Sequence, residues 1–319
     1  MHTAIFDVTN LMYISAAAVS KNIKYDKGAT VEDIPKMVLH SVLLMMFKWK
    51  TKLKTDNVIA AFEGGNNWRK TYTEENNSVR KYKANRVYDP MYAELRNTLP
   101  LFKTLLDETT ALTVFSIDKM EADDAIAAFC QLEANENHQV TIVSSDQDYI
   151  QLLKNENVKL LNPITGQYRN IPSDKKYVEN IDYWLFLKLI RGDTGDNVPS
   201  AFPNVRETKL KEAFNDSFKM INLLNESWKD ANGNVNLVKD RIEENRILMD
   251  LSCQPDNIRS ELESGVRQQW NRNRVYNHIK FLSGLGKLGL NSIAQDIEKL
   301  KPILITPAIK TVKQSTIEF

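Results

Sequence analysis

The chain has 319 residues, of which 42% are hydrophobic, and its formal net charge is +1. It is long enough to bury a sizeable core, and any strongly basic surface has to be a local concentration. Only two cysteines are present, Cys130 and Cys253, which excludes a disulfide-stapled scaffold and favours a reducing cytoplasm. The longest apolar run, residues 42–47, is too short to span a bilayer, and the amino terminus lacks a signal pattern, so we expect no membrane partner.

Three short apolar segments lead into acidic residues. Each has the composition of a buried strand, and a helical pattern follows the last of them from Tyr149 onward. The segments are residues 3–6, 57–62 and 140–143, and the acids that follow them are Asp7, Glu63, Asp146 and Asp148. A helix of core residues is expected between them at about 32–53. Because ligands bind at the carboxyl edge of open α/β sheets, we expect these acids to face one site.

Cations alternate with aromatic rings between about residues 66 and 90. The cations are Arg69, Lys70, Arg80, Lys81, Lys83 and Arg86, the opposing acids are only Glu74 and Glu75, and the rings include Trp68, Tyr72 and Tyr82. Cations neutralise phosphates and rings stack on bases, so this pattern favours binding of a nucleic-acid single strand. A solvated loop with a few exposed rings is the simpler alternative. The neighbouring acidic edge favours the interpretation as a nucleic-acid-binding segment.

A further strand is predicted at 112–117, and a helix begins after it at Glu121. The first turn of this helix holds Glu121, Asp123 and Asp124, of which the first and last lie three residues apart and share a face. Acids in a first turn also suit the positive end of the helix dipole. Helix capping is therefore the ordinary explanation for this cluster on its own.

Helices are expected to dominate after residue 163. A hairpin-like return at 165–169 precedes a buried helix at 183–190, which leads into a third acidic cluster at residues 192–197 that contains Asp193 and Asp196. Amphipathic stretches at 241–251, 257–270 and 275–285 predict a helical carboxyl-terminal region.

The density of acids predicts a divalent metal site. Carboxylates packed together repel one another and are driven toward protonation unless cations lie between them, and a hard ion such as Mg²⁺ prefers oxygen ligands. Any single cluster has an ordinary explanation as a cap, an Asx turn or a polar loop. The four histidines form no pair at metal-ligand spacing, and there is no Cys-x-x-Cys motif.

The order of these motifs resembles the 5′→3′ exonuclease and flap endonuclease family, most closely its T-even phage branch of ribonucleases H. The resemblance covers about Asp7 to Pro199 and is carried by Ile5-Phe-Asp, Phe62-Glu, Glu121-Ala-Asp-Asp, Ser144-Ser-Asp-Gln-Asp and Gly192-Asp-Thr-Gly-Asp-Asn-Val-Pro. It implies two-metal hydrolysis of phosphodiesters near 5′ ends, with two Mg²⁺ ions that Mn²⁺ can replace. It also implies removal of RNA primers and DNA flaps during phage DNA replication.

The resemblance assigns roles to particular residues. It places Asp7, Glu63, Glu121, Asp123 and Asp124 at the first metal and Asp146, Asp148, Asp193 and Asp196 at or near the second, with Asp146 able to serve both. The implied catalytic residues are Lys83, which would contact the scissile phosphate, Arg86, Asp123 and Asp146. The implied nucleic-acid contacts are Trp68, Arg69, Lys70, Arg80, Lys81, Tyr82, Lys83 and Arg86, together with Arg206, Lys209 and Lys211.

Two positions depart from the family pattern. Glu63 stands where related phage enzymes have Asp, which changes the reach of that ligand by one methylene. Residues 198–209 contain no glycine, although most flap endonucleases have a glycine-rich helix-hairpin-helix there that grips duplex phosphates and often a K⁺ ion. We therefore expect side chains, not backbone amides, to hold the duplex.

The predicted fold is α/β, with a mainly parallel central sheet flanked by helices, as in PIN-like 5′ nucleases. The expected domains are an α/β nuclease domain at 1–180 with a helical arch at about 66–90, a smaller helical DNA-binding domain at 181–305 with a divergent helix-hairpin-helix-like region, and a tail at 306–319. The rival functions are a PIN-class ribonuclease that cuts single-stranded RNA and a catalytically weak nucleic-acid-binding protein.

The expected partners follow from the resemblance. They are DNA and RNA–DNA hybrids with a free 5′ end or a flap, a single-strand-binding protein and a sliding clamp. The last residues, 314–319, loosely match the glutamine, aliphatic and aromatic pattern of clamp-docking peptides, and an unstructured polar tail is the alternative. We expect the protein to be a monomer in the cytoplasm.

Overall fold

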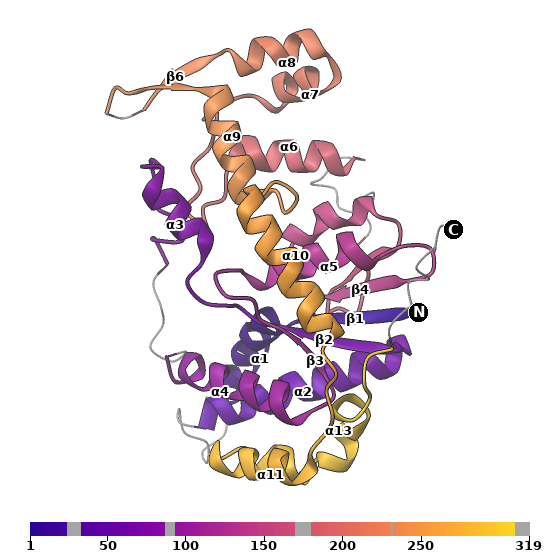
Figure 1. Ribbon diagram of the computed structural model, residues 1–319. Helices are drawn as coiled ribbons and strands as arrows, with labels where there is room; N and C mark the ends of the chain where they lie inside the picture. The colour runs from indigo at the N-terminus through magenta and orange to yellow at the C-terminus, as the bar shows by residue number, and fades with distance from the viewer. Residues whose placement is uncertain (24–32, 87–92, 170–179, 231, 310–319) are drawn as a thin grey trace.

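The computed structural model describes residues 1–23, 33–86, 93–169, 180–230 and 232–309 (Figure 1). Its centre is a parallel sheet with the strand order β3-β2-β1-β4-β5. The strands are β1 (His2–Asp7), β2 (Asn57–Ala61), β3 (Thr113–Phe115), β4 (Gln139–Val143) and β5 (Val158–Leu161). The mainly parallel sheet predicted from the sequence is confirmed.

Alternate residues of the strands pack into two hydrophobic cores, one on each face of the sheet. On β1, Phe6 lies in the first core and Ile5 in the second, because successive side chains of a strand point to opposite faces. The first core is covered by α1 (Val8–Ile23), α2 (Ile34–Leu53) and α4 (Ala93–Thr109). The second is covered by α5 (Ala122–Glu133) and the 3₁₀ helix η3 (Asp148–Lys154). Burial on both faces explains the nearly continuous apolar composition of the strands.

A third, smaller core forms where α6 (Ile181–Arg191) meets four later elements. These are α7 (Glu207–Asn215), α8 (Ser217–Leu224), the β6–β7 hairpin (Ser227–Lys229 and Val235–Leu237) and the start of α9 (Val238–Met249). Figure 1 places α7, α8 and the hairpin together at one end of the molecule. The buried side chains of this end form a core separate from the two cores of the sheet.

The last four helices return to the sheet. Side chains of α10 (Asp256–Asn271) join the second core, and side chains of α11 (His278–Lys287), α12 (Asn291–Gln295) and α13 (Ile297–Leu304) join the first. Thus the region after residue 250 completes the cores around the sheet instead of building one of its own. The domain boundary at 180/181 stays a prediction.

Some local expectations differ from the structure. The segment from Asp148 is a 3₁₀ helix, in which side chains three residues apart eclipse one another. The β6–β7 hairpin was not predicted from the sequence. Residues 87–90 of the expected arch and 310–319 of the expected tail, with the clamp-like peptide, lie outside the described residues. Within the described part, no helix combines the length and apolarity needed to cross a membrane.

Candidate metal and nucleic-acid site

Three acids of the predicted site follow neighbouring strands of the sheet. Asp7 ends β1, Glu63 lies two residues beyond β2, and Asp146 lies three residues beyond β4. Because β2, β1 and β4 are adjacent and parallel, their carboxyl ends meet at one edge. The amino end of α5, with Glu121 and Asp123, comes to the same edge, since Trp68 and Gly64 hydrogen-bond to the turn that precedes α5.

Asp7 is buried among hydroxyl groups. Its carboxylate accepts hydrogen bonds from the hydroxyl of Tyr149 at 2.9 Å, from the hydroxyl of Ser144 at 3.3 Å and from the backbone N–H of Asn10 at 3.0 Å. Burial raises the pKa of Asp7 despite these donors. A carboxylate so placed is fixed in position, and among the described residues it has no ion-pair partner, which suits a metal ligand.

Glu63 and Glu121 differ in their surroundings. The Glu63 side chain is exposed, yet loss of surrounding water and then the negative charge of Glu121 raise its pKa. Glu121 is buried, which opposes its ionisation, but Arg69 and Lys83 outweigh burial and lower its pKa to about 2.

The structure corrects the roles expected for Arg69 and Trp68 and pairs both with Asp124. The guanidinium of Arg69 donates to both carboxylate oxygens of Asp124, at 2.7 and 2.8 Å, and to Glu121 at 2.9 Å. The indole N–H of Trp68 donates to Asp124 as well, at 3.0 Å. All three side chains are buried, with Asp124 fully enclosed. Asp124 is therefore a structural partner of Arg69, and its role as a metal ligand stays a prediction. Neither Arg69 nor Trp68 exposes its side chain to a nucleic acid.

The nucleic-acid contact expected for Tyr82 is also contradicted by burial. Its ring is buried, and its hydroxyl lies 2.9 Å from Glu121 and 2.8 Å from Asp196, so the ring cannot stack on a base. The eight other predicted contacts keep exposed or cavity-lining side chains and stay predictions. They are Lys70, Arg80, Lys81, Lys83, Arg86, Arg206, Lys209 and Lys211.

Lys83 and Arg86 point from the arch toward the acids. The ammonium of Lys83 bonds to Glu121 and lies 3.8 Å from Asp196. The guanidinium of Arg86 donates to Asp196 at 2.6 Å. Burial alone would lower the pKa of Lys83, but Glu121 and Asp196 raise it, so this side chain stays charged at neutral pH. Both cations are thus directed at the acidic edge of the sheet.

A second acidic group lies beside the first. Asp146, Asp148 and Asp193 line a hollow of about 460 Å³. Lys188 of α6 enters this hollow, bonds to Asp148 and lies 3.7 Å from Asp193. Burial and then nearby negative charge raise the pKa of Asp148, with Lys188 acting in the opposite direction. Three of the four acids assigned to a second metal are therefore together, and a lysine lies among them. The fourth, Asp196, lies instead beside Tyr82 and Arg86, next to the first acidic group.

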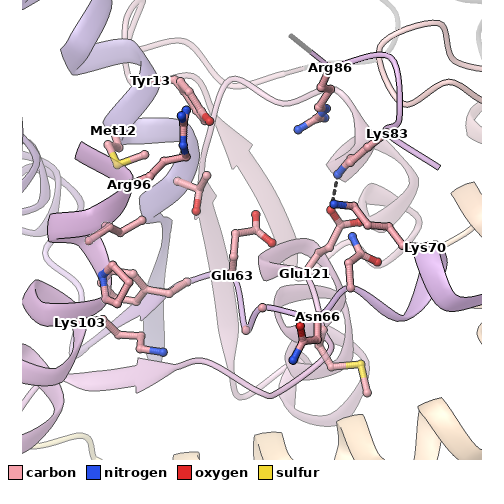
Figure 2. Close-up of a pocket in the computed structure, with 18 residues that line it drawn as sticks. Met12, Tyr13, Glu63, Asn66, Lys70, Lys83, Arg86, Arg96, Lys103 and Glu121 are labelled. Atoms are coloured by element: carbon pink, nitrogen blue, oxygen red, sulfur yellow. Dashed lines mark hydrogen bonds and ion pairs between the residues drawn. The ribbon is translucent and has the colours of Figure 1, made fainter. Parts of the chain in front are cut away.

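The larger cavity, of about 560 Å³, opens in front of the first acidic group. Figure 2 shows Glu63 and Glu121 projecting into it, with Lys70, Lys83 and Arg86 on one side. Arg96 and Lys103 of α4 lie on the opposite side with Met12 and Tyr13 of α1 (Figure 2). The cavity thus offers carboxylates at its floor and cations on both walls, which suits a polyanionic strand.

The donor chemistry of this edge fits a divalent cation. Beside Glu121 and Asp124, which are paired with Arg69, the edge carries further carboxylates that outnumber Lys83, Arg86 and Lys188. Burial raises the pKa of Asp123, and the like charges of Asp124 and Glu121 add to this rise, although Arg69 acts in the opposite direction. Within the described residues, no three acids, histidines or cysteines converge into a preformed metal group. Lys83 lies among the carboxylates of the first acidic group, and Lys188 lies among those of the second.

Several residues of the site were missed in the sequence. Lys188 had a usable signal, because it interrupts an apolar run of this helix five residues before Asp193. Tyr149 and Ser144 flank the recognised acids but carry no pattern of their own. Arg96 and Lys103 are seven residues apart on α4 and so share a helix face, yet only the fold shows that this face looks into the cavity.

Comparison with known proteins decides the family. The protein family described as 5′-3′ exonuclease, N-terminal resolvase-like domain, matches residues 2–181, more than half of the chain. The chain belongs to this 5′-3′ exonuclease family. The matched range contains the sheet, the arch and every predicted acid except Asp193 and Asp196. Those two lie just beyond it, after α6.

The individual proteins that this chain resembles include a ribonuclease H, a flap endonuclease and a DNA polymerase I. The chain is 28% identical over 201 residues to ribonuclease H of Enterobacteria phage T4, covering 58% of this chain and 60% of that protein. It is 28% identical over 203 residues to flap endonuclease Xni of Pseudoalteromonas translucida, covering 62% and 72%. It is 25% identical over 311 residues to DNA polymerase I of Caldicellulosiruptor bescii, covering 92% of this chain and only 34% of that much longer protein.

Solved structures agree with the fold of this exonuclease family. The crystal structure of the T5 D15 protein co-crystallised with metal ions aligns with a TM-score of 0.57 at 17% identity, covering 84% of this chain and 99% of that one. The T5 D15 flap endonuclease pseudo-enzyme–product complex with DNA and metal ions aligns with a TM-score of 0.56. At this identity the likeness establishes the shared fold.

Proposed function

We propose that the chain is a metal-dependent 5′ nuclease that hydrolyses phosphodiesters near free 5′ ends of DNA and RNA–DNA hybrids. One observation carries the proposal: acids from three adjacent strand ends and from α5 share an edge with the arch cations Lys83 and Arg86, in front of a 560 Å³ cavity. The family match and the names of the relatives support the same reaction class. The T5 relatives solved with metal ions and DNA support a divalent ion and a DNA substrate.

In this proposal the chain's own residues bind and orient the substrate. Lys83 and Arg86 bind the scissile phosphate, and the cavity walls hold the adjoining strand. Asp7, Glu63, Glu121 and Asp123 would hold one ion, and Asp146, Asp148, Asp193 and Asp196 would hold the other. When bound, a pair of Mg²⁺ or Mn²⁺ ions would activate water and stabilise negative charge on the reacting oxygens. The Tyr149 hydroxyl, which donates to Asp7, keeps that ligand in place.

The exposed cations of the helical region extend the proposed substrate surface. Arg206, Lys209 and Lys211 lie on α7 and just before it, beyond the Asp196 loop, and are exposed. Lys209 is held near Glu226 at 2.7 Å. A duplex would be bound here by side-chain contacts to phosphates while its 5′ strand enters the cavity. Removal of primers and flaps in phage replication, with a single-strand-binding protein and a clamp as partners of a monomer, belongs to this proposal.

Product analysis tests the proposed function. A 5′-labelled flap, a nicked duplex and an RNA-primed hybrid would be incubated with and without Mg²⁺, and a single-stranded RNA would be included. Short 5′ products from the three structured substrates, only with the ion, are expected. Cleavage of the single-stranded RNA alone would support a PIN-class ribonuclease instead. Binding without cleavage under every ion condition would leave a nucleic-acid-binding protein.

A further inference from the structure

Three backbone-directed hydrogen bonds join the arch to the acidic loop after α6. The N–H of Lys83 donates to the carbonyl of Asp196 at 2.8 Å. The side-chain amide of Asn197 donates to the carbonyl of Lys81 at 2.8 Å, and that of Asn85 donates to the carbonyl of Thr194 at 2.7 Å. Segments more than a hundred residues apart in the chain are thus connected over a few residues on each side.

These three hydrogen bonds fix the backbone position of the arch segment, which the ion pairs of Lys83 and Arg86 do not fix. Long Lys and Arg side chains can reach a carboxylate from many backbone positions, because they have several rotatable bonds. The bonds made by Asn85 and Asn197 instead end on main-chain carbonyl groups, and so they set the position of the backbone from Lys81 to Arg86. The ammonium of Lys83 and the guanidinium of Arg86 are then presented to the acids from a defined distance.

The backbone conformations at this contact are unusual. Lys83 has φ = 55° and Asn197 has φ = 60°, in the left-handed region that residues with a Cβ seldom adopt. Asn tolerates this region, whereas Lys has no local compensation for it. Such a conformation persists only when the surrounding contacts impose it, and it is most common at functional sites. At Lys83 it directs the N–H onto the Asp196 carbonyl.

The other side of the same segment is anchored to α3 (Trp68–Glu75). The N–H of Tyr82 donates to the hydroxyl of Thr73 at 3.1 Å, and the N–H of Ser78 donates to the carbonyl of Thr73 at 3.1 Å. Thr73 is fully buried. The turn that carries Lys83 is therefore held between α3 and the acidic loop, and a shift of either one would move its ammonium.

We propose that Asn85 and Asn197 are positioning residues that latch the arch onto the acidic loop and so place Lys83 and Arg86 at the reacting phosphate. Neither asparagine touches the substrate in this proposal. Each acts through the backbone it holds. The proposal rests on the proposed function only where it concerns turnover, because the latch itself is a property of the free protein.

The first test measures the latch without substrate or metal. Asn197→Gly removes the amide donor and retains access to the left-handed conformation. Asn85→Ala removes the second donor, and Asn204→Gly is the matched control, since Asn204 is exposed and also has φ = 60°. Hydrogen exchange at the Lys83 amide should rise about two- to tenfold in each latch variant, the loss expected from one hydrogen bond. Exchange equal to that of the control in both variants would overturn the latch.

The second test measures cleavage of a labelled flap. In the latch variants kcat should fall by about tenfold or less, in proportion to the rise in exchange. KM should change little, because Arg206, Lys209 and Lys211 are unaltered. Faster exchange with unchanged kcat would overturn the positioning role. If the wild-type protein cuts no substrate, the proposed function fails, and the exchange comparison still decides the latch.

Discussion

At the scale of single residues, Arg69 shows how an apparent binding residue became a structural one. Its position among six cations and several rings favoured a phosphate contact. The folded chain encloses it, and its guanidinium donates to Glu121, Asp124 and the carbonyl of Leu248. A bidentate pair needs the planar fork of arginine, and a buried charge needs partners on every side. Burial was the deciding property, and local composition does not report it.

Replacing Arg69 should therefore affect stability. In Arg69→Met, Asp124 would keep a buried charge without its partner, and we expect the free energy of unfolding to fall by about 3–5 kcal/mol. Lys70→Met, at the exposed neighbouring position, should change it by less than about 0.5 kcal/mol. Urea denaturation of the two variants measures the difference. Equal stabilities would show that the Arg69 network contributes nothing net.

Asp146 should separate binding from chemistry. Asp146→Asn removes a charged oxygen at the junction of the two acidic groups while keeping the size of the side chain. We expect cleavage of a labelled flap to be lost and the affinity for the same flap, measured by fluorescence anisotropy in Ca²⁺, to be retained. Near-normal turnover of this variant would remove Asp146 from the proposed metal set.

His138 should make stability depend on pH. It is buried beside Phe129 and Trp270, and loss of solvent lowers its pKa to about 4. The unfolded chain binds a proton near pH 6.5, so the folded state is favoured above that value and loses stability as the pH falls from about 6.5 toward 4. Denaturation midpoints measured across this range should decline less in His138→Gln. A parallel decline in both proteins would assign the effect elsewhere.

At the scale of elements, α4 and the arch form two cationic walls around one cavity. Arg96 and Lys103 of α4 face Lys70, Lys83 and Arg86 across Glu63 (Figure 2). The arch was recognisable because its cations are adjacent in the sequence. The α4 wall was not, since two cations seven residues apart are ordinary on any exposed helix. Only the crossover from β2 to β3 brings that face to the acids.

The α4 wall should contribute to the salt dependence of strand binding. Each cation that neutralises one phosphate of a single strand adds about 0.7 to the slope of log affinity against log salt. In the double variant Arg96→Gln and Lys103→Gln, we expect the slope to decrease by about 1.4 in magnitude. Lys280→Gln, at an exposed position of α11, is the control. Titrations with an oligonucleotide at several NaCl concentrations give the slopes, and an unchanged slope would exclude the wall from the strand path.

At the scale of the whole molecule, helices that are distant in the sequence pack into the same core. The sheet and its acidic edge were predictable because each strand is a short apolar run that ends in a polar cluster. From the sequence, the helices after residue 250 were assigned to a separate region. Amphipathicity indicates that a helix buries one face, but it does not identify the element against which that face packs. In the structure their apolar faces complete the two cores of the sheet.

The third core should open on its own. It is small, and the exposed side chains of Phe218, Ile221 and Val235 show how little of α8 and the hairpin is covered. Native-state hydrogen exchange should give residues 207–237 a lower opening free energy than α5, whose apolar side chains are buried. A single opening free energy for both regions would mean that the molecule unfolds as one unit.

The bond from Arg69 to the Leu248 carbonyl has a consequence for biosynthesis. The guanidinium is fully satisfied only when residue 248 is available, although the acids it holds come from the first 124 residues. On the ribosome, we therefore expect this charge to be enclosed only after α9 has emerged. The acidic edge would then be completed late in translation, and nascent chains that stop before α9 should remain susceptible to proteases.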